Sequence, residues 1–281
     1  MSHYITLDKA REYKKHYENF PVATLIFPKK IRDAATLLYQ FARQCDDIAD
    51  EGSFSKQDRL QQLNIYKKQI HNLKRKTAIR TPLFSDIKKV VDNHKLDHSL
   101  FNRFMVAFEQ DIKKNNYRNI EDLISYCNNA ANPAGEMILT LFKKNTKKNI
   151  IYSNSLCTSL ALLGMLQDMP EDYNKGRIYI PQNEMKKFKL SPTDIKDKNF
   201  GYNWIAYKEF WVNRIEVILE HGKPLEKRLQ GRLKLQIRIL IKAIELLIKR
   251  VKNSNCDLFN RPPKLSKFDW ARITLKSIIP L

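Results

Sequence analysis

The stretch from residue 39 to residue 51 reads Tyr-Gln-Phe-Ala-Arg-Gln-Cys-Asp-Asp-Ile-Ala-Asp-Glu. Its apolar residues, together with those just before it, recur at the spacing of an amphipathic helix. Asp46 and Asp50 lie four residues apart and share one face of this helix, with Arg43 one turn earlier. Like charges at this spacing repel, and carboxylates near a helix C-terminus meet the negative end of the helix dipole. Because folding gains nothing from this pair, the sequence predicts a partner that neutralises it.

A second acidic pair, Asp168 and Asp172, again follows an apolar run. A single acidic pair is as often a solvated helix end as a site. Two pairs far apart in the chain, each after a hydrophobic helix, can instead face each other across the core of a helical bundle. Mg²⁺ takes oxygen ligands, usually from one or two carboxylates together with phosphate and water. The two pairs therefore favour a site for hard cations.

Length and composition favour one all-α domain spanning residues 1–281. The 281 residues are enough for a sizeable core, and only 7 Gly and 11 Pro interrupt them, without an internal repeat or a low-complexity linker. The formal net charge of +21 would suit anionic partners, but the Lys residues are spread over every segment, which favours compositional drift as the explanation. The sequence contains no nucleic-acid-binding motif, so we expect no nucleic-acid partner.

The cysteines and the N-terminus indicate a reducing compartment. Cys45, Cys127, Cys157 and Cys256 are isolated in the sequence, without metal-ligand spacing or the density of a disulfide framework. The N-terminus has no signal-peptide pattern, and no stretch approaches about 20 uncharged apolar residues. We expect a cytoplasmic protein, and peripheral contact with the inner face of the membrane remains open.

Hydrophobic periodicity predicts a series of helices. The predicted ranges are 4–18, 31–50, 58–73, 83–91, 99–112, 120–131, 134–142, 151–168, 204–221 and 225–253, with an extended segment at 175–181. The helix at 151–168 is apolar on nearly every side and should be buried. The break at Asn132-Pro133 predicts either a cavity beside Asn132 or an ordinary connection between core helices. The basic helix at 225–253 and the apolar tail from Ile273 can each cover a core or lie on lipid.

These residues suit the ionisation of an allylic diphosphate. Two facing acidic pairs would hold Mg²⁺ ions that clamp the diphosphate, and the apolar helices would supply a dry pocket for a hydrocarbon chain. Arg43 can make bidentate contacts to phosphate oxygens, and Arg177 and Tyr126 can do likewise. The sequence contains no Gly-rich phosphate loop, no Cys-His metal cluster and no nucleophile elbow, which disfavours other chemistry.

The sequence resembles the squalene and phytoene synthases, all-α prenyltransferases whose two Asp-rich motifs bind Mg²⁺ and diphosphate. The resemblance covers roughly residues 15–250 and rests on residues 39–50, on Tyr-Cys-Asn-Asn-Ala-Ala-Asn-Pro-Ala-Gly at 126–135, and on residues 168–172 followed by Lys-Gly-Arg-Ile-Tyr-Ile-Pro at 175–181. It implies a helical bundle with a central active-site cavity. By this resemblance the catalytic residues are Asp46, Asp50, Asp168, Asp172 and Tyr126, the metal ligands are Asp46, Asp47, Asp50, Asp168 and Asp172, and the diphosphate is bound by Tyr39, Arg43, Arg177 and Asn19.

Within the family, Glu-Asn-Phe-Pro-Val-Ala at 18–23 and Ala-Asn-Pro at 131–133 resemble the hopanoid-pathway branch HpnC. This likeness implies hydroxysqualene synthase activity, in which presqualene diphosphate loses diphosphate, the cyclopropylcarbinyl cation rearranges, and water captures it without NADPH. It also implies other squalene-pathway enzymes as partners. One alternative is head-to-head condensation of farnesyl or geranylgeranyl diphosphate to squalene, dehydrosqualene or phytoene. Another is a non-catalytic assembly factor on the same fold.

Three positions depart from the family pattern on the side of the second acidic pair. Ala161 and Gly164 stand where the family usually has Gln and Asn, and Pro170 stands where it usually has Gly. A proline at this position should disturb the helical turn that joins Asp168 to Asp172. We therefore expect weaker or differently arranged ligation of metal and diphosphate on this side.

Overall fold

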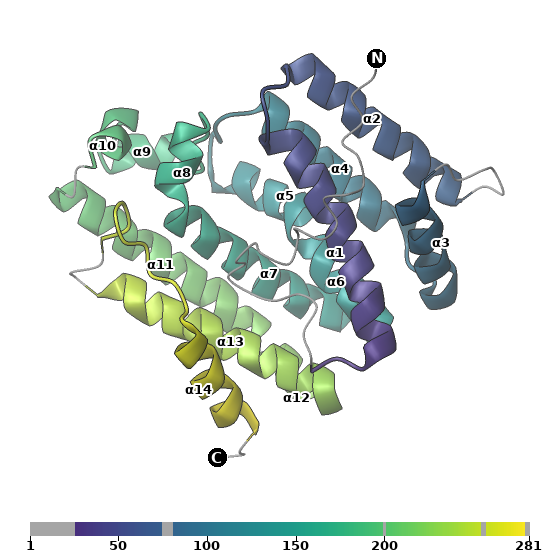
Figure 1. Cartoon of the computed structure of the whole chain (residues 1–281). Helices are drawn as coiled ribbons and strands as arrows, with labels where there is room; N and C mark the ends of the chain where they lie inside the picture. Colours follow the sequence, from purple (N-terminus) through teal and green to yellow (C-terminus); the bar gives the residue numbers. More distant parts are fainter. Residues whose placement is uncertain (1–25, 75–80, 199–200, 254–256, 279–281) are drawn as a thin grey trace.

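The computed structural model describes residues 26–74, 81–198, 201–253 and 257–278, and these residues fold into helices (Figure 1). In chain order the helices are α1 (Lys29–Asp50), α2 (Lys56–Leu73), α3 (Pro82–His94), α4 (His98–Lys113), α5 (Ile120–Ala130), α6 (Asn132–Leu141), α7 (Lys147–Gln167), α8 (Met169–Asn174), α9 (Gln182–Lys187), α10 (Pro192–Lys196), α11 (Tyr202–Gly222), α12 (Pro224–Arg228), α13 (Gly231–Lys252) and α14 (Lys267–Ile278). These ranges contain no strand, and Asn116 and Ile178 form an isolated parallel bridge. The predicted all-α class is confirmed, and the predicted helix at 4–18 lies outside the described residues.

The helices pack around two hydrophobic clusters. Helices α1 to α4 enclose one cluster, to which Met137 and Leu141 of α6 contribute. The second cluster lies among α5, α7, α11 and α13. Ile138 packs against both clusters, so α6 joins them. That residues 1–281 form a single domain stays a prediction.

Helix α7 runs through the middle of the molecule, packed against α6 and α11 (Figure 1). By length and composition alone, this helix is apolar enough to cross a membrane. Its packing explains the composition, because a helix enclosed by other helices needs apolar residues on several sides. The prediction that this segment is a core helix is confirmed.

The chain breaks between α5 and α6, at the place that the sequence predicted. Pro133 lies in the first turn of α6, where its missing N–H costs no helical hydrogen bond. The buried Asn132 donates from Nδ2 to Asn128 Oδ1 at 2.8 Å and accepts from Thr158 Oγ1 at 3.1 Å. Because Thr158 belongs to α7, this break is a connection that ties two helices to the central one. Asn132 does not line the pocket described below.

The predicted helix at 225–253 is divided into α12 and α13, so the prediction of one continuous helix is wrong. Leu229 between them has extended backbone and a buried side chain. Gly231 has a φ of +58°, in the left-handed region that favours glycine. The turn at Gly231 thus allows Leu229 to enter the core, which a continuous helix would not.

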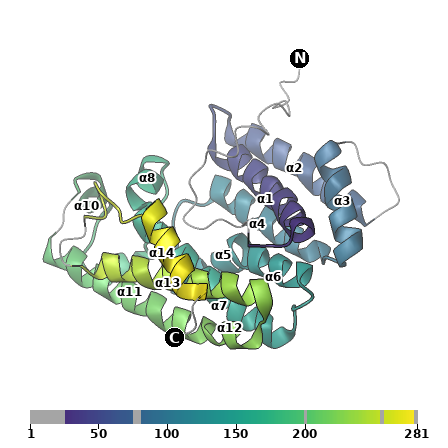
Figure 2. The ribbon, with the colours of Figure 1, turned by 60° about the horizontal axis from the view of Figure 1, so that its bottom comes forward.

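The C-terminal tail docks on the bundle as helix α14, which lies across α13 (Figure 2). From α13, Arg238 donates to the carbonyl oxygen of Ser277 at 2.8 Å, and Lys242 donates to that of Lys276 at 2.6 Å. Cations near the C-terminal end of a helix also interact favourably with the negative end of its dipole. The sequence reasoning did not predict α14 or the short helices α8, α9 and α10, and the last three are too short to show periodicity.

Candidate active site

The C-terminal half of α1 carries the first acidic motif. Arg43 reaches along this helix, with Nη1 2.9 Å from Asp46 Oδ2 and Nη2 2.9 Å from Asp47 Oδ1. Its Nε is buried and has no hydrogen-bond partner among the described residues. Burial raises the pKa of Asp46 to about 6, Asp50 raises it further and Arg43 lowers it. The Asp46 side chain is nevertheless 40% exposed, so water limits this rise and a ligand can reach the carboxylate.

The second acidic motif lies where α7 gives way to α8. Pro170, in the first turn of α8, coincides with a break in the helix at Asp168, as predicted. The backbone N–H of Asp172 still donates to the carbonyl oxygen of Asp168 at 2.9 Å, so the two residues stay within one turn. Burial raises the pKa of Asp172 to about 7, Asp168 raises it as well, and Arg177 and Lys175 lower it. This half of the site therefore carries an excess of negative charge.

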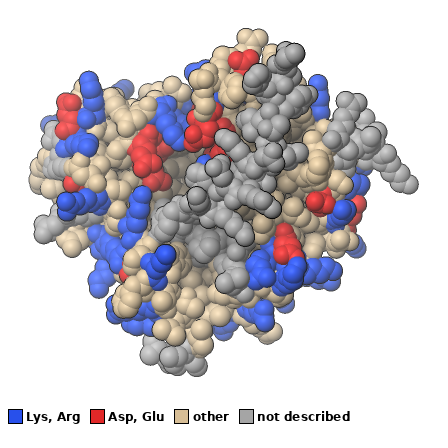
Figure 3. All heavy atoms as spheres, viewed as in Figure 1, with Lys and Arg blue, Asp and Glu red and all other residues tan. Residues whose placement is uncertain are grey.

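The two motifs meet through Asp50. Arg177 forms an ion pair with Asp50, and Lys175 Nζ lies 3.3 Å from Asp50 Oδ2. These contacts connect residues more than a hundred positions apart in the chain. Figure 3 shows acidic side chains gathered on this face near α8 and the end of α1. The structure thus brings both acidic pairs to one place, while the roles of their residues stay predictions.

Asp111, in the last turn of α4, belongs to this site and was missed by the sequence reasoning. Its Oδ2 accepts a hydrogen bond from Tyr126 Oη at 3.1 Å, and its Oδ1 is buried without a partner among the described residues. Burial raises the pKa of Asp111 to about 7, while the Arg177 guanidinium lowers it. The signal that marked Asp46 and Asp50, a carboxylate at the unfavourable end of an amphipathic helix, also applies to Asp111.

Three tyrosine rings surround this carboxylate. The ring centroids of Tyr117, Tyr126 and Tyr179 lie 5.6 to 5.8 Å apart. Arg177 Nη1 donates to Tyr179 Oη at 3.4 Å, so Asp50 and Tyr179 together orient the guanidinium. Burial raises the pKa of each tyrosine, which keeps the hydroxyl groups protonated. Of the three, the sequence reasoning singled out Tyr126 alone.

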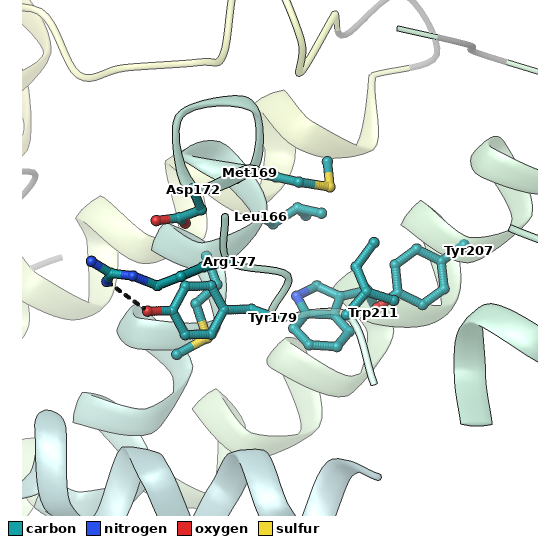
Figure 4. Close-up of a pocket in the computed structure, with 9 residues that line it drawn as sticks. Leu166, Met169, Asp172, Arg177, Tyr179, Tyr207 and Trp211 are labelled. Atoms are coloured by element: carbon teal, nitrogen blue, oxygen red, sulfur yellow. Dashed lines mark hydrogen bonds between the residues drawn. The ribbon is translucent and has the colours of Figure 1, made fainter. Parts of the chain in front are cut away.

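A pocket runs inward from the acidic motifs (Figure 4). About 290 Å³ of space, part of it open to solvent, lies between its lining atoms. The nine lining residues are Met165, Leu166, Met169, Asp172, Arg177, Tyr179, Ile180, Tyr207 and Trp211. Asp172 and Arg177 lie on one side, and Tyr207 and Trp211 lie on the other (Figure 4). The pocket therefore has a charged end beside the acidic motifs and a mainly apolar end.

The remaining predicted positions do not line this pocket, and one of them lies outside the described residues. Tyr39 is half-buried and lies one helical turn before Arg43. It is close enough to contribute to the raised pKa of the Arg43 guanidinium. Ala161 and Gly164 are half-buried, Ala161 packs against the core, and a Cβ at Gly164 would meet no heavy atom within 4 Å. Position 164 therefore has room for a polar side chain. Asn19 lies outside the described residues.

The donor set fits a divalent cation, although the carboxylates are partly paired with protein cations. Across the described ranges, no three His, Cys, Asp or Glu side chains converge as a preformed metal site. Asp172 nevertheless lines the pocket, and Asp50 lies close enough to both Asp46 and Asp172 to raise their pKa values together with burial. Repulsion of this kind is relieved by a bound cation with oxygen ligands. These three carboxylates would hold Mg²⁺, with Asp47 and Asp168 completing the predicted ligand set.

Known sequences resemble this chain over most of its length. The sequence profile of the family described as squalene/phytoene synthase matches residues 13–269. A hydroxysqualene synthase from Zymomonas mobilis is 33% identical over 182 residues, which is 63% of this chain and 59% of the relative. A hydroxysqualene synthase from Sinorhizobium fredii is 24% identical over 239 residues, 84% of this chain and 80% of the relative. The chain thus spans less than two thirds of the first relative and more of the second.

Solved structures share the fold. The squalene synthase HpnC from Alicyclobacillus acidocaldarius is 27% identical, with a TM-score of 0.79 over 86% of this chain and 90% of that chain. A dehydrosqualene synthase in complex with a ligand is 20% identical, with a TM-score of 0.84 over 95% and 93% of the two chains. The second likeness, at this identity, shows the fold alone.

Proposed function

Because the chain belongs to the squalene/phytoene synthase family, we propose that it is a Mg²⁺-dependent enzyme that converts presqualene diphosphate and water into hydroxysqualene and diphosphate. Enzymes of this family process prenyl diphosphates and generally depend on a divalent metal. The matches to relatives named hydroxysqualene synthase support the choice of reaction. The observation that carries the proposal is the contact of Arg177 with Asp50 at the mouth of a largely apolar pocket.

The charged end of the pocket would bind and release the diphosphate. Mg²⁺, when bound, supplies positive charge that stabilises the departing diphosphate. Arg177 lines the pocket and can turn from Asp50 to phosphate oxygens once the carboxylate has a metal to bind. The buried Nε of Arg43 is a second donor without a partner among the described residues. Both guanidinium groups would therefore hold the diphosphate while the carbon–oxygen bond breaks.

The apolar end of the pocket would protect the carbocation. Met165, Leu166, Met169 and Ile180 present uncharged, mainly apolar groups that would exclude bulk water from the cation. Tyr126 donates to Asp111 beside the charged end, which holds a neutral hydroxyl near the departing group. The protein thus separates a charged leaving group from a shielded hydrocarbon chain.

A product assay tests the reaction. Purified enzyme is incubated with presqualene diphosphate and Mg²⁺ without NADPH, and hydroxysqualene and diphosphate are expected. Parallel incubations contain farnesyl or geranylgeranyl diphosphate. If these two substrates give squalene, dehydrosqualene or phytoene and presqualene diphosphate gives no alcohol, the chain is a condensing synthase instead.

A complementation assay separates catalysis from the assembly-factor alternative. Asp50→Ala and Asp172→Ala remove one carboxylate from each motif. If the chain is the proposed enzyme, neither variant should restore growth of a strain that depends on this chain. Wild-type growth of both variants would contradict the catalytic function and favour an assembly factor.

We further propose that the enzyme acts in the cytoplasm, against the inner face of the membrane, through α14. Phe268, Leu275 and Ile278 on this helix are 75%, 61% and 57% exposed. The basic residues on the exposed side of α14 are Lys267, Arg272 and Lys276. The acidic Asp269 faces inward and pairs with Arg250 at 2.6 Å. An apolar strip flanked by cations suits anionic lipid, and an apolar substrate favours a nearby bilayer.

Sedimentation with phosphatidylglycerol vesicles tests this surface. The wild type is expected to bind, and Phe268→Glu with Leu275→Glu is expected to reduce binding by about tenfold or more because both apolar groups are lost. Val217→Glu, at an exposed position of α11, is the matched control. Equal binding by the wild type and the double variant would exclude α14 as the contact.

Two further measurements test the remaining expectations. Co-purification with other squalene-pathway enzymes tests the proposed partners. A single unfolding transition of the whole chain tests whether residues 1–281 form one domain.

A further inference from the structure

The apolar end of the pocket contains a buried hydroxyl group. Tyr207 on α11 is fully buried and lines the pocket. Among the nine lining residues, Tyr207 has the only buried side-chain polar atom without a hydrogen bond of ordinary geometry to a described residue, although the Glu184 carboxylate lies close enough to act on its hydroxyl as an acceptor. The indole Nε1 of Trp211, by contrast, donates to the carbonyl oxygen of Leu162 at 3.1 Å. A phenol that donates toward a carboxylate still has oxygen lone pairs free to accept, so this hydroxyl can bind a partner that enters with the reaction.

An ion pair lies behind this hydroxyl. Arg214 of α11 donates to both oxygens of the buried Glu184 of α9, at 3.1 and 2.6 Å. This forked contact fixes the orientation of the carboxylate. Burial raises the pKa of Tyr207, the Glu184 carboxylate raises it further and Arg214 lowers it. The phenol is therefore protonated, and a carboxylate that can accept its proton lies beside it.

The pocket separates this hydroxyl from the groups proposed to bind diphosphate. Figure 4 shows Tyr207 and Trp211 on the side away from Arg177 and Asp172. The Tyr207 and Trp211 ring centroids lie 5.7 Å apart, and aromatic faces stabilise a nearby cation. After ionisation, the diphosphate remains with its charged partners while the rings favour positive charge on the carbon chain. Tyr207 is thus the polar group at the end where the cation needs a nucleophile.

We propose that Tyr207 holds the water molecule that captures the carbocation and relays the released proton to Glu184. The inference rests on the proposed formation of hydroxysqualene. A lone pair of the water forms the new carbon–oxygen bond and leaves an oxonium ion. The oxonium gives a proton to the phenolic oxygen of Tyr207 as the phenolic proton moves to Glu184. The alcohol is then neutral, and Glu184 returns its proton to water when the products leave.

The proposed role makes Tyr207 the residue that determines the class of product. A cation without a positioned water loses a proton from a neighbouring carbon and becomes a hydrocarbon with one more double bond. Both outcomes consume presqualene diphosphate and release diphosphate. The ratio of alcohol to hydrocarbon therefore reports on Tyr207, whereas the rate of diphosphate release reports on the charged end of the pocket.

Tyr207→Phe tests the inference by removing one oxygen atom. The expected result is a fall of about tenfold or more in the ratio of alcohol to hydrocarbon, as for loss of a group that moves a proton. Diphosphate release should change by less than about threefold, since the variant leaves the charged end intact. Tyr152→Phe is the matched control, because Tyr152 packs against His221 outside the pocket lining. It should leave the product ratio unchanged.

Glu184→Gln provides a second variant, which keeps the shape of the side chain and removes the proton acceptor. It should shift the products in the same direction as Tyr207→Phe. Wild-type product ratios in both variants, with normal diphosphate release, would overturn the role of Tyr207 and leave the proposed function standing. Failure of the wild type to consume presqualene diphosphate would overturn both. Thermal unfolding should show that Tyr207→Phe folds normally, because the variant removes one oxygen atom and keeps the buried ring.

Discussion

Each carboxylate of the first acidic motif has an ion-pair partner, whereas the cations that follow the second motif pair with the first. On α1, Arg43 pairs with Asp46 and Asp47. The cations that follow the second motif, Lys175 and Arg177, pair with Asp50 of the first. Among the described residues, Asp168 and Asp172 of the second motif form no ion pair, and burial raises the pKa of Asp172 to about 7. Two acidic motifs at one site need not have equal roles, and we expect the second motif to gain more from a bound cation.

Removal of one carboxylate from each motif should give the largest effects and should distinguish the motifs. Asp50→Asn and Asp172→Asn should each lower kcat/KM by about 10²–10³-fold, because each weakens charge stabilisation at the departing diphosphate. Their effects on the metal-free fold should be opposite. Asp50→Asn leaves buried Arg177 without its carboxylate and should cost about 3 kcal/mol in the free energy of unfolding. Asp172→Asn removes a repelled carboxylate and should raise stability at pH 8.

Urea unfolding in the presence of a chelator measures both variants. Asp33→Asn on the exposed part of α1 is a control for a surface carboxylate and should change stability little. Equal destabilisation by Asp50→Asn and Asp172→Asn would contradict the difference between the motifs.

The two cations of the second motif should also differ. Arg177 is largely buried, lines the pocket and touches both Asp50 and Tyr179, whereas Lys175 is largely exposed. Arg177→Gln should lower kcat/KM by about 10²-fold, since a guanidinium directed at the diphosphate is lost. Lys175→Gln should lower it by less than about tenfold, because water screens an exposed ion pair. Steady-state kinetics with presqualene diphosphate make the comparison, and equal losses would show that net charge matters more than position.

The helical fold was largely readable from the sequence because its helices are long and amphipathic. The α1 range was predicted within two residues, and α7 was recognised as a core helix from its apolar sides. The exception is the turn between α12 and α13. One glycine, Gly231, has the left-handed backbone that breaks the helix there, and the hydrophobic periodicity continues on both sides of it. Periodicity alone does not reveal such a break.

The sequence predicts the site residues that belong to a local motif. It does not predict the residues that come together only when helices pack. Asp46 and Asp50 stand out because they repel each other on one helix. Tyr207 and Glu184 lie on different helices, in segments with ordinary composition, and they become neighbours only when α9 packs beside α11. The pairing of Arg177 with Asp50 likewise depends on the fold, since these residues come from opposite halves of the chain.

Asp111→Asn tests the carboxylate that connects the two motifs. The folded-state pKa of Asp111 lies near 7, above the ordinary value, because burial disfavours the charged form. The folded state therefore binds this proton more tightly than the unfolded state, and the stability it contributes is lost as pH rises from about 4 to about 7. In metal-free enzyme, Asp111→Asn should be more stable than the wild type by on the order of 1 kcal/mol at pH 8, with no gain at pH 4.

Urea unfolding at both pH values checks this sign. Asp92→Asn, an exposed carboxylate paired with Lys88, is the control and should show no such dependence. A gain of the same size at pH 4 and pH 8 would mean that the charge of Asp111 is not what destabilises the fold. Tyr126 donates to the Asp111 side chain in the wild type, and in the variant it should donate to the side-chain amide oxygen at position 111.

The smallest effect is expected from adding a ligand to the weaker half of the site. A Cβ at Gly164 meets no neighbour within 4 Å, so Gly164→Asn should fold normally and slightly favour the helix, where Gly costs about 0.5 kcal/mol more than Asn. Its amide oxygen lies one turn before Asp168 and offers the oxygen ligand that the family usually has. The Mg²⁺ concentration for half-maximal activity should fall by about threefold to tenfold. Gly164→Ala, which gains the helix propensity without the oxygen, should leave the Mg²⁺ dependence unchanged. If both variants shift it equally, the second motif is limited by the rigidity of α7 and not by a missing ligand.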